Sequence, residues 1–542
     1  MDTQRLILFS IFSFSLLLLW SAWQERYRPA PAVSSTQTPT HARSSPGVPP
    51  AQAPGLKAEA SSSAQRIRVK TDLLDVEIDS IGGDLRRVAL SRYRKEPSQS
   101  ESLVLLDEKG EYPYYTQSGL IGTDLPTHKS AYQPRQLDYS MAAGANTLKV
   151  DLYWRGASGV RVTKSLTFRR ASYVVDVAYE IVNESAHGID AHAYFQLVRD
   201  GRAADKQSKL LPTYTGAAVY TDQDKFHKVS FEDIGKGRSD YIKQARDGWV
   251  AMLEHYFISA WLPVADTPRE YFTRALGENL YSVGVIVPAS VAAGGRVRVA
   301  VPLYVGPQEQ ERLEKVAPGL GLAVDYGWLT VIAAPLFWLL EFIHRGVGNW
   351  GVAIIFLTVL IKLAFFPLSA KSYKSMAQMR VLTPKMQKLK EQYGDDRQKM
   401  QQAVVELYKS ENINPLGGCL PIVVQIPVFI ALYWVLLASV EIRHAPFAAW
   451  IHDLSSPDPY YVLPVVMGAT MLIQTRLNPP PPDPIQAKVM MIMPFAFSIF
   501  FFFFPAGLVL YWLVNNVLSI AQQWHITRQT EQSKSTKGNA RA

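Results

Sequence analysis

A long apolar run in the carboxyl-terminal half, residues 350–368 (WGVAIIFLTVLIKLAFFPL), most constrains how this chain can fold. The run is long enough to span a bilayer, and Lys362 is its only charge. A cation at that depth costs roughly 2.5 to 3.5 kcal/mol, so we expect Lys362 to face water, a partner or a cavity. Thr358, one turn earlier on the same face, favours a polar groove. The alternative is that the lysine stem snorkels to the interface, about 10 Å away.

The composition indicates a membrane protein with more than one domain. The chain has 542 residues, of which 48% are hydrophobic and 19% are charged. Its net charge of +9 is not accompanied by zinc-finger spacing or a basic-aromatic motif, so we do not predict nucleic acid as a partner. A single cysteine, Cys419, excludes an internal disulfide. Extracytoplasmic parts must therefore fold by packing alone.

The amino-terminal segment predicts a membrane anchor. Its apolar stretch, residues 6–23, follows Arg5 and is longer than the core of a cleavable signal. We therefore predict an uncleaved transmembrane anchor over 1–28, with its amino end in the cytoplasm. Residues 29–64 are rich in Pro, Ala, Ser and Thr, a composition typical of a disordered linker.

A periodicity of two residues then predicts β-strands. Apolar residues alternate with polar ones in several stretches from Ile67 to Val305, with glycine-containing turns between them. The strands predict a large all-β sandwich over 65–318. Since this domain follows an anchor whose amino end is cytoplasmic, we place it in the periplasm.

The segment that follows the β domain is just long enough to span a membrane. Charge decides against this, because residues 371–414 carry nine basic and five acidic residues and therefore belong in the cytoplasm. If residues 326–343 crossed the bilayer as well, that basic segment would lie outside. We predict instead an amphipathic helix in the periplasmic interface, over 319–346.

The remaining apolar runs predict a core of five membrane helices. The predicted order is a span at 347–369, a cytoplasmic helical hairpin at 370–414, a span at 415–440, a periplasmic loop at 441–459, a span at 460–477, a cytoplasmic loop at 478–487, spans at 488–504 and 505–525, and a basic cytoplasmic tail at 526–542. The predicted fold class is thus a membrane α-helical bundle, with one anchor and a five-helix core, that carries a periplasmic β-sandwich.

Each of the five core spans holds isolated polar residues. They are Thr358, Lys362, Gln425, Thr470, Gln474, Ser498, Tyr511, Asn515, Ser519 and Gln522. The last four recur at helical spacings and form one stripe. With no acidic partner in any span, the set indicates a wet, positively charged groove. The alternative is that such residues only hold helices together, at about 0.6 kcal/mol each, which best fits Gln474 and Ser519.

The basic segment predicts two amphipathic helices, 369–393 and 397–409. They are hinged at Gly394, Asp395 and Asp396. Apolar positions that include Met376, Met379 and Met386 recur at steps of three and four, and methionine surfaces adapt to varied partners. The alternative is a hairpin that packs on itself, and both can hold.

Several catalytic motifs are absent from the sequence or out of place. There is no phosphate-binding loop and no HExxH motif, and the GxSG match at 156–159 falls in a turn of the β domain without a histidine partner. We therefore predict no enzyme activity, no cofactor and no metal site. The rival class is a secondary transporter or channel with a periplasmic binding domain, against which stand the missing inverted repeat and coupling carboxylate. A protease or acyltransferase is the weaker alternative.

Four stretches of the membrane part resemble the YidC family of membrane protein insertases. They are residues 347–386, 414–436, 444–468 and 504–516, and residues 68–85 (RVKTDLLDVEIDSIGGDL) are similar to the opening strands of the long form found in double-membraned bacteria. The resemblance covers nearly the whole chain except the linker. It implies an inner-membrane insertase and chaperone that acts alone or beside the Sec translocon. The implied partners are nascent inner-membrane proteins, the Sec translocon with its accessory subunits, the ribosome and membrane lipid.

The resemblance also assigns roles to residues. An arginine usually occupies the position of Lys362 in the groove, and lysine keeps the charge but loses the planar fork for bidentate capture of a carboxylate. Of the polar lining that we predict for the groove, Thr358, Gln425, Asn515 and Ser519, the resemblance implies Thr358. The implied contacts to the inserting segment are Ile426, Phe429, Tyr511 and Trp512.

Overall fold

The computed structural model of the chain describes residues 64–96, 100–202, 214–394, 396–411, 420–478 and 484–539. These residues form two compact units, one up to residue 324 and one from residue 325 onward. The predicted anchor at 1–28 and the predicted linker, apart from residue 64, lie outside the described residues.

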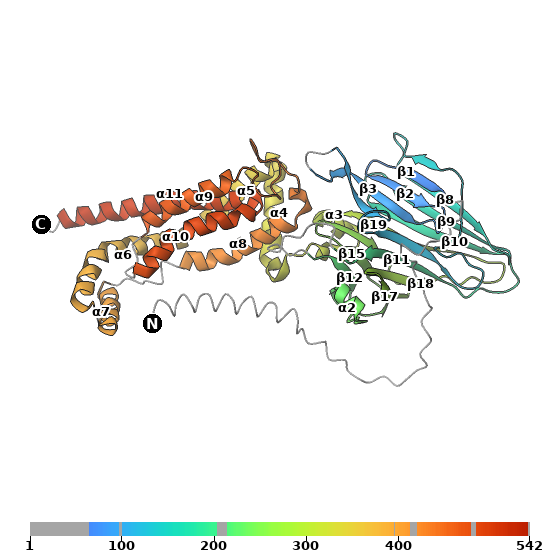
Figure 1. Ribbon diagram of the computed structural model, residues 1–542, viewed down its shortest axis with the longest axis horizontal. Coiled ribbons are helices and arrows are strands. Elements are labelled where there is room, and N and C mark those ends of the chain that lie inside the picture. Colours follow the sequence, from blue (N-terminus) through green and yellow to red (C-terminus); the bar gives the residue numbers. More distant parts are fainter. Residues whose placement is uncertain are drawn as a thin grey trace, which may run out of the picture. The chain divides into compact units, whose positions relative to one another are not determined.

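The first unit is built from two large, mainly antiparallel β-sheets in the described residues (Figure 1). The ten-stranded sheet has the order β14 (Gln244–Ala245), β17 (Arg269–Gly277), β18 (Leu280–Pro288), β11 (His192–Asp200), β5 (Tyr114–Ile121), β4 (Ser102–Asp107), β3 (Leu85–Arg94), β2 (Leu74–Asp79), β1 (Arg66–Lys70) and β7 (Asp138–Ser140). The nine-stranded sheet has the order β13 (Lys225–Val229), β12 (Gly216–Thr221), β15 (Trp249–Leu253), β16 (Phe257–Trp261), β19 (Arg296–Pro307), β10 (Val174–Asn183), β9 (Val160–Arg169), β8 (Thr147–Arg155) and β6 (Gln133–Pro134).

Alternation along the strands explains the sandwich. In β10 the alternate residues from Val175 to Ile181 are buried, and Val177 lies opposite Leu166 of β9 and Val301 of β19, which are buried too. Successive side chains of a strand point to opposite faces, so this register places one apolar face of the sheet against the core. The predicted β-sandwich is confirmed.

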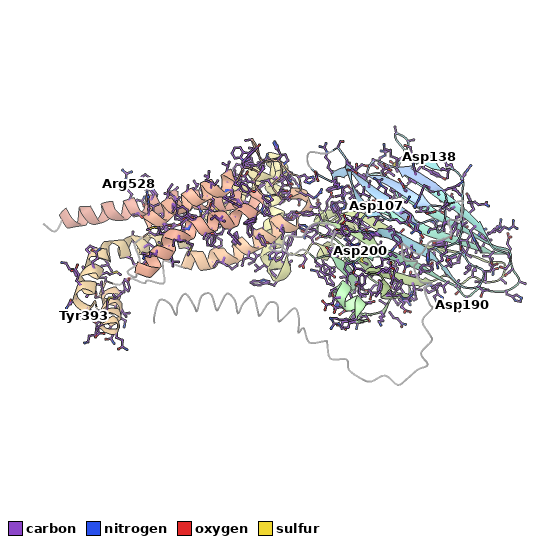
Figure 2. All side chains as sticks on the ribbon, in the orientation of Figure 1. Asp107, Asp138, Asp190, Asp200, Tyr393 and Arg528 are labelled. Carbon is purple, nitrogen blue, oxygen red and sulfur yellow. The ribbon has the colours of Figure 1, made fainter. Side chains whose placement is uncertain are left out.

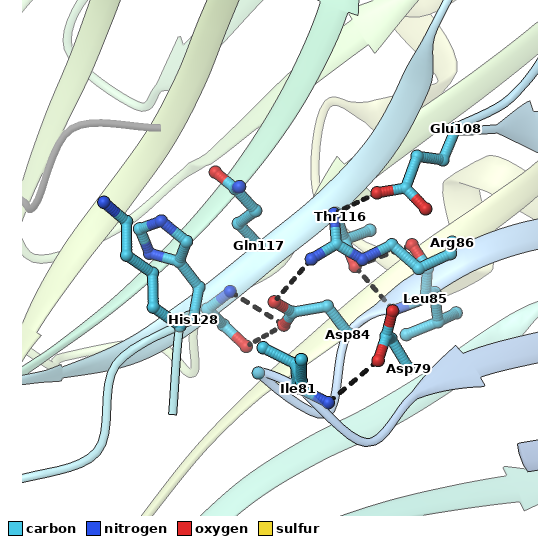
Figure 3. A network of polar contacts seen from close by, with 12 residues as sticks. Asp79, Ile81, Asp84, Leu85, Arg86, Glu108, Thr116, Gln117 and His128 are labelled. Atoms are coloured by element: carbon cyan, nitrogen blue, oxygen red, sulfur yellow. Dashed lines mark hydrogen bonds and ion pairs between the residues drawn. The ribbon is translucent and has the colours of Figure 1, made fainter. Parts of the chain in front are cut away.

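A buried ion pair links the two sheets inside the sandwich. Asp84 precedes β3 of the ten-stranded sheet, whereas Lys164 lies on β9 of the nine-stranded sheet. The Lys164 ammonium donates to the Gly82 carbonyl (2.7 Å), the Asp84 carboxylate (2.7 Å) and the Ser118 hydroxyl (2.8 Å). The Arg86 guanidinium lies beside the same carboxylate (Figure 3). All three donors of the lysine are therefore satisfied.

Short helices complete the β unit and extend it beyond its predicted end. They are α2 (Phe231–Gly235), α3 (Gln310–Val316) and the 3₁₀ helix η1 (Leu320–Ala323). Leu320 is buried, η1 packs against α3, and the Trp249 indole donates to the Pro318 carbonyl at 3.0 Å. Residues 319–324 therefore belong to the β unit, and not to the interfacial helix predicted from residue 319.

The regular elements of the second unit are helices in the part of the chain that the structure describes, and a loop at 443–461 separates two of them. Its elements are η2 (Gly327–Leu329), α4 (Thr330–Val347), α5 (Trp350–Ala364), α6 (Phe366–Tyr393), α7 (Arg397–Ser410), α8 (Leu420–Ala438), η4 (Val440–Ile442), α9 (Val462–Leu477), α10 (Pro484–Phe500), η5 (Phe501–Phe503) and α11 (Ala506–Asn539). Helix α11 packs against α5, α6 and α9, whereas α10 packs against α9 and α4 packs against α5 and α8 (Figure 1). The predicted helical core is confirmed.

The apolar run that carries Lys362 is not one straight helix. Helix α5 ends at Ala364, and α6 begins at Phe366 with a bend of 67°. Pro367 stands in the first turn of α6, where proline is tolerated, but it cannot continue α5 because it lacks an N–H and its ring crowds the preceding turn. The predicted span at 347–369 is therefore bent after Ala364, and Lys362 lies in the last turn of α5.

Length and apolarity alone identify few membrane-spanning helices among the described residues. Residues Gly327–Val347 qualify, and α5 qualifies only together with Phe366–Met379 across the bend. The apolar helices Val424–Ala438, Val462–Leu477 and Ala487–Phe503 are shorter. The six predicted spans and the interfacial position of α4 therefore stay predictions.

The ends of several helical elements differ from the predicted ones. Helix α10 begins at Pro484 instead of 488, and residues 479–483 of the predicted loop lie outside the described residues. Helix α11 continues through most of the predicted tail, to Asn539. Tyr393 at the end of α6 and Arg528 on α11 lie toward the same end of the helical unit (Figure 2). This common end agrees with the prediction that hairpin and tail share one side of the membrane.

The predicted periplasmic loop 441–459 is ordered by a buried carboxylate. Asp458 accepts hydrogen bonds from the Trp450 indole (3.0 Å) and from the backbone N–H groups of Tyr460 (3.0 Å) and Leu463 (2.7 Å). The last of these N–H groups belongs to the first turn of α9, where an anion is also favoured by the helix dipole. Asp458 thus fixes where α9 begins.

Candidate functional site

The predicted groove residues come from three helices of the helical unit. Thr358 and Lys362 lie on α5; Gln425, Ile426 and Phe429 lie on α8; and Tyr511, Trp512, Asn515 and Ser519 lie on α11. Helix α11 packs against both α5 and α8. Asn349 fixes the start of α5, because its side chain accepts a hydrogen bond from the Val352 N–H at 3.0 Å.

Lys362 points into the helical core. Its side chain is 8% exposed, and its ammonium donates to the Ser519 hydroxyl at 2.8 Å. Ser519 in turn donates to the Asn515 carbonyl of its own helix at 2.7 Å. In the structure the Lys362 side chain therefore does not snorkel to the membrane interface but points into the helical core. The position of Lys362 in the last turn of α5 also places it at the negative end of the helix dipole, which favours a cation.

No carboxylate in the described residues forms an ion pair with Lys362. Helices α5, α8, α9 and α10 contain no Asp or Glu, and in α11 the first acidic residue is Glu531. An ammonium has three donors, and the structure assigns one of them, to a neutral hydroxyl. The site therefore holds a buried cation with one neutral hydrogen-bond partner among the described residues.

The predicted substrate-contact residues form one aromatic cluster. The Phe429 ring lies 6.3 Å from the Tyr511 ring and 4.8 Å from the Trp512 ring, measured between centroids. The Gln425 amide donates to the Tyr511 hydroxyl at 2.8 Å, and Tyr511 is buried. Ile426 is 48% exposed. The cluster thus joins α8 to α11 and leaves an apolar side chain on the surface beside it.

Two of the predicted lining residues are buried, and their polar atoms differ in whether they have a hydrogen-bond partner. Thr358 is buried on the Lys362 face, but its hydroxyl donates to the Ile354 carbonyl one turn back at 2.7 Å. Asn515 is buried, and its Oδ1 atom has no hydrogen-bond partner among the described residues. The polar lining is therefore incomplete by one buried acceptor.

Other polar residues of the core hold helices together instead. The Asn516 amide donates to the Thr470 hydroxyl at 3.5 Å, and the Gln523 amide donates to the Asn478 side chain at 3.0 Å; both contacts join α11 to the segment of α9. Ser498 of α10 donates to the Pro464 carbonyl of α9 at 2.9 Å. Sequence reasoning did not single out Asn516 or Gln523, although each lies one residue from the predicted stripe.

The helical hairpin of α6 and α7, predicted to be cytoplasmic, packs on itself. Met376, Met379 and Met386 are half-buried, and the Tyr408 hydroxyl of α7 contacts the Met386 sulfur of α6 at 3.6 Å. Lys385 pairs with Glu411. These contacts support the self-packing alternative.

A short turn joins α6 to α7, and a groove lies between the two helices. At the turn Gly394 ends α6 and Asp396 caps α7 by accepting from the Lys399 N–H at 3.1 Å, whereas Asp395 lies outside the described residues. Between the helices is an open groove of about 550 Å³, lined by Lys385, Lys388, Leu389, Tyr393, Ala403, Glu406, Leu407 and Ser410.

Two observations in the described part of the chain concern the protease alternative and a possible metal site. The Ser158 hydroxyl of the GxSG match donates to the Asp124 carboxylate at 2.5 Å in an exposed turn. No group of three or more His, Cys, Asp or Glu side chains there is placed to hold a metal ion.

A helical membrane core with a buried lysine and a large β-sandwich domain defines a class of membrane-embedded protein. The family described as "YidC periplasmic domain" matches residues 66–339, and the family described as "60Kd inner membrane protein" matches residues 342–534. The chain belongs to the YidC family of membrane protein insertases. Its helical unit is accordingly an inner-membrane core and its β unit a periplasmic domain, as predicted.

Curated relatives are similar over the whole chain. "Membrane protein insertase YidC" of Aromatoleum aromaticum is 55% identical over 546 residues, which cover 99% of each chain. The protein of the same name from Methylobacillus flagellatus is 55% identical over 555 residues, which cover 100% of each chain. A solved structure, "Active YidC insertase crystal structure with the first transmembrane domain resolved", is 17% identical with a TM-score of 0.40, and covers 85% of this chain and 92% of that chain. The relatives are named as insertases and not as enzymes, in agreement with the predicted non-enzymatic function.

Proposed function

We propose that this chain inserts hydrophobic segments into the inner membrane and moves their short polar flanks across it, at a positively charged groove formed by α5, α8 and α11. The buried Lys362 ammonium carries the proposal. It lies in the helical core with one neutral hydrogen-bond partner and no carboxylate partner among the described residues. Membership of the insertase family supports the same reading.

The proposed mechanism uses attraction and burial without covalent chemistry. An acidic or polar flank enters the groove toward Lys362, where a low effective dielectric strengthens the attraction. Gln425 and Asn515 offer amide groups to the flank. The apolar segment slides along Ile426 and the aromatic cluster into lipid, and burial of its surface, at roughly 25 cal/mol per Å², drives the flank across.

The partners and the orientation in the membrane belong to the same proposal. Family membership supports nascent inner-membrane proteins as substrates, and we extend this to the Sec translocon, the ribosome and surrounding lipid as partners. Both termini are placed in the cytoplasm. The common end of Tyr393 and Arg528 in the helical unit supports one side of the membrane for the hairpin and for the carboxyl-terminal end of α11, and we propose that this side is the cytoplasm (Figure 2).

Protease protection tests the proposed function. A single-span substrate with one aspartate in its translocated flank is added to liposomes that contain only the purified protein, without nucleotide. Protection of the flank is the expected result. Leakage of small solutes with an exposed flank would favour the transporter or channel class instead.

Variants of Lys362 test the role of the charge. A hydrogen bond to a charged group contributes about 1.5 to 3 kcal/mol, so Lys362→Ala should lower insertion of the aspartate substrate about tenfold or more, and Lys362→Glu should lower it further. Lys362→Arg should retain insertion. Lys488→Ala is the matched control, because it removes an exposed lysine of α10. Equal activity of the Ala and Glu variants would remove the charge from the mechanism.

A further inference from the structure

The hydrogen bond between Lys362 and Ser519 has only one possible donor, the lysine ammonium. The Ser519 hydroxyl gives its proton to the Asn515 carbonyl at 2.7 Å, so its lone pairs remain for the ammonium at 2.8 Å. A lysine ammonium can only donate, and a hydroxyl oxygen with its proton engaged can only accept. The serine is therefore oriented by its own helix to receive the lysine of another helix.

The lysine needs such an acceptor to stay inside. Its flexible four-carbon stem starts from the last turn of α5, so it is long enough to carry the charge to the interface. Among the described residues, the hydrogen bond to Ser519 is the one that holds the ammonium in the core. One turn earlier on α11, the Asn515 Oδ1 atom is buried without a partner in the same described part of the chain. The ammonium thus has two donors that no described acceptor takes, and these donors remain for an incoming carboxylate.

We infer that Ser519 is a positioning residue, which holds the Lys362 ammonium inside the helical core at the depth and orientation from which it meets an acidic flank. The effect of Ser519 on insertion rests on the proposed function, whereas its hydrogen bond with Lys362 does not. Ser519 need not touch the inserting segment, because it acts through the lysine. From the sequence alone, Ser519 best fits a helix-holding role; its hydrogen bond from the Lys362 ammonium adds the positioning role.

Chemical labelling tests the contact without any insertion activity. The purified full chain in liposomes is treated with limiting acetic anhydride, and acetylation of Lys362 is followed by mass spectrometry. Loss of a hydrogen bond to a charged group should raise the labelling rate in Ser519→Ala about tenfold or more. Ser519→Thr keeps the hydroxyl and should label within about twofold of the unsubstituted chain. The matched control is Ser498→Ala, since it removes a helix-to-helix hydroxyl elsewhere in the core.

Insertion selectivity tests the consequence. Two substrates that differ only by aspartate or asparagine in the translocated flank are inserted side by side. Ser519→Ala should lower the ratio of aspartate to asparagine insertion about fivefold or more. Ser519→Thr should restore the ratio. A purely structural role would lower both substrates together.

Each outcome decides one of the two claims. An unchanged labelling rate in Ser519→Ala overturns the inference, as does an equal loss of both substrates. Faster labelling with a lower ratio supports it. If Lys362→Ala leaves the ratio unchanged, the charge mechanism of the proposed function fails, and the labelling comparison still decides whether Ser519 holds the ammonium.

Discussion

The buried ion pair between the two sheets offers a sharp test of how the β domain is held together. Asp84 and Lys164 are each 1% exposed, and their charged atoms are 2.7 Å apart. Burial raises the pKa of Asp84 and lowers that of Lys164, because a low-dielectric interior disfavours both charges, and each charge then depends on the other. We examine the pair with Asp84→Asn, Lys164→Met and the double variant.

The magnitude follows from what each substitution leaves behind. Removing one partner of a buried ion pair costs about 3 to 5 kcal/mol in the free energy of unfolding, since the other charge remains without compensation. Asp84→Asn should lie at the upper end, because it leaves the lysine beside the Arg86 cation. Lys164→Met should lie at the lower end, because Arg86 and the Ser118 N–H, at 2.9 Å, still face the carboxylate.

The double variant separates coupling from packing. It removes both charges, so we expect it to cost about as much as one single variant and clearly less than their sum. Hydrogen exchange with mass spectrometry on the full chain in detergent measures the opening free energy of β3, β5 and β9 directly. Lys149→Met on β8 is the control, since its 2.9 Å ion pair with Asp151 is largely exposed and should matter by less than about 1 kcal/mol. Additive effects of the two single variants would refute the reasoning.

Two further predictions concern carboxylates outside the helical core. Asp458→Ala leaves the Trp450 indole and two backbone N–H groups without their acceptor, so it should lower the local opening free energy at the start of α9 by about 2 to 3 kcal/mol in hydrogen exchange. The pKa of Asp233 is held below its ordinary 3.8, first by the Ser230 hydroxyl and then, against its partial burial, by Arg238. Its contribution to α2 is therefore present above pH 3.8 and lost as the pH falls below it, and Ser230→Ala should flatten this decline in exchange protection.

The sequence predicted the architecture where a short-range pattern carries it. Alternation of two in β10 and β19 follows from one face being buried, and that pattern is local. The break at Phe365 was missed because an apolar window averages over Pro367, whose effect is on the backbone and not on hydrophobicity. The Asp84–Lys164 pair was also missed, because its members are 80 positions apart and neither stands in a motif.

The sequence predicted which residues form the candidate site better than it predicted their hydrogen bonds. Helical spacing places Tyr511, Asn515 and Ser519 on one face of α11, and all three are buried. Spacing does not say which acceptor a hydroxyl chooses. The hydroxyls of Thr358 and Ser519 each donate to a carbonyl of their own helix. The Ser519 oxygen also accepts a hydrogen bond from the Lys362 ammonium, because α5 packs on α11 with Ser519 opposite the lysine.

A cation without a carboxylate partner, as Lys362 is among the described residues, is better suited to the proposed function than an ion pair. A carboxylate beside Lys362 would neutralise it and remove the attraction for an acidic flank. Without one, the ammonium keeps part of its desolvation cost, which the Ser519 hydroxyl and the end of α5 offset only in part. In the mechanism that we propose, an entering carboxylate would remove the remainder and would leave when the flank reaches water on the far side. Lysine suits such transient binding, because its point charge attracts a carboxylate without the bidentate geometry that arginine imposes. We therefore expect Lys362→Arg to hold an acidic flank longer and to release it more slowly than the natural lysine.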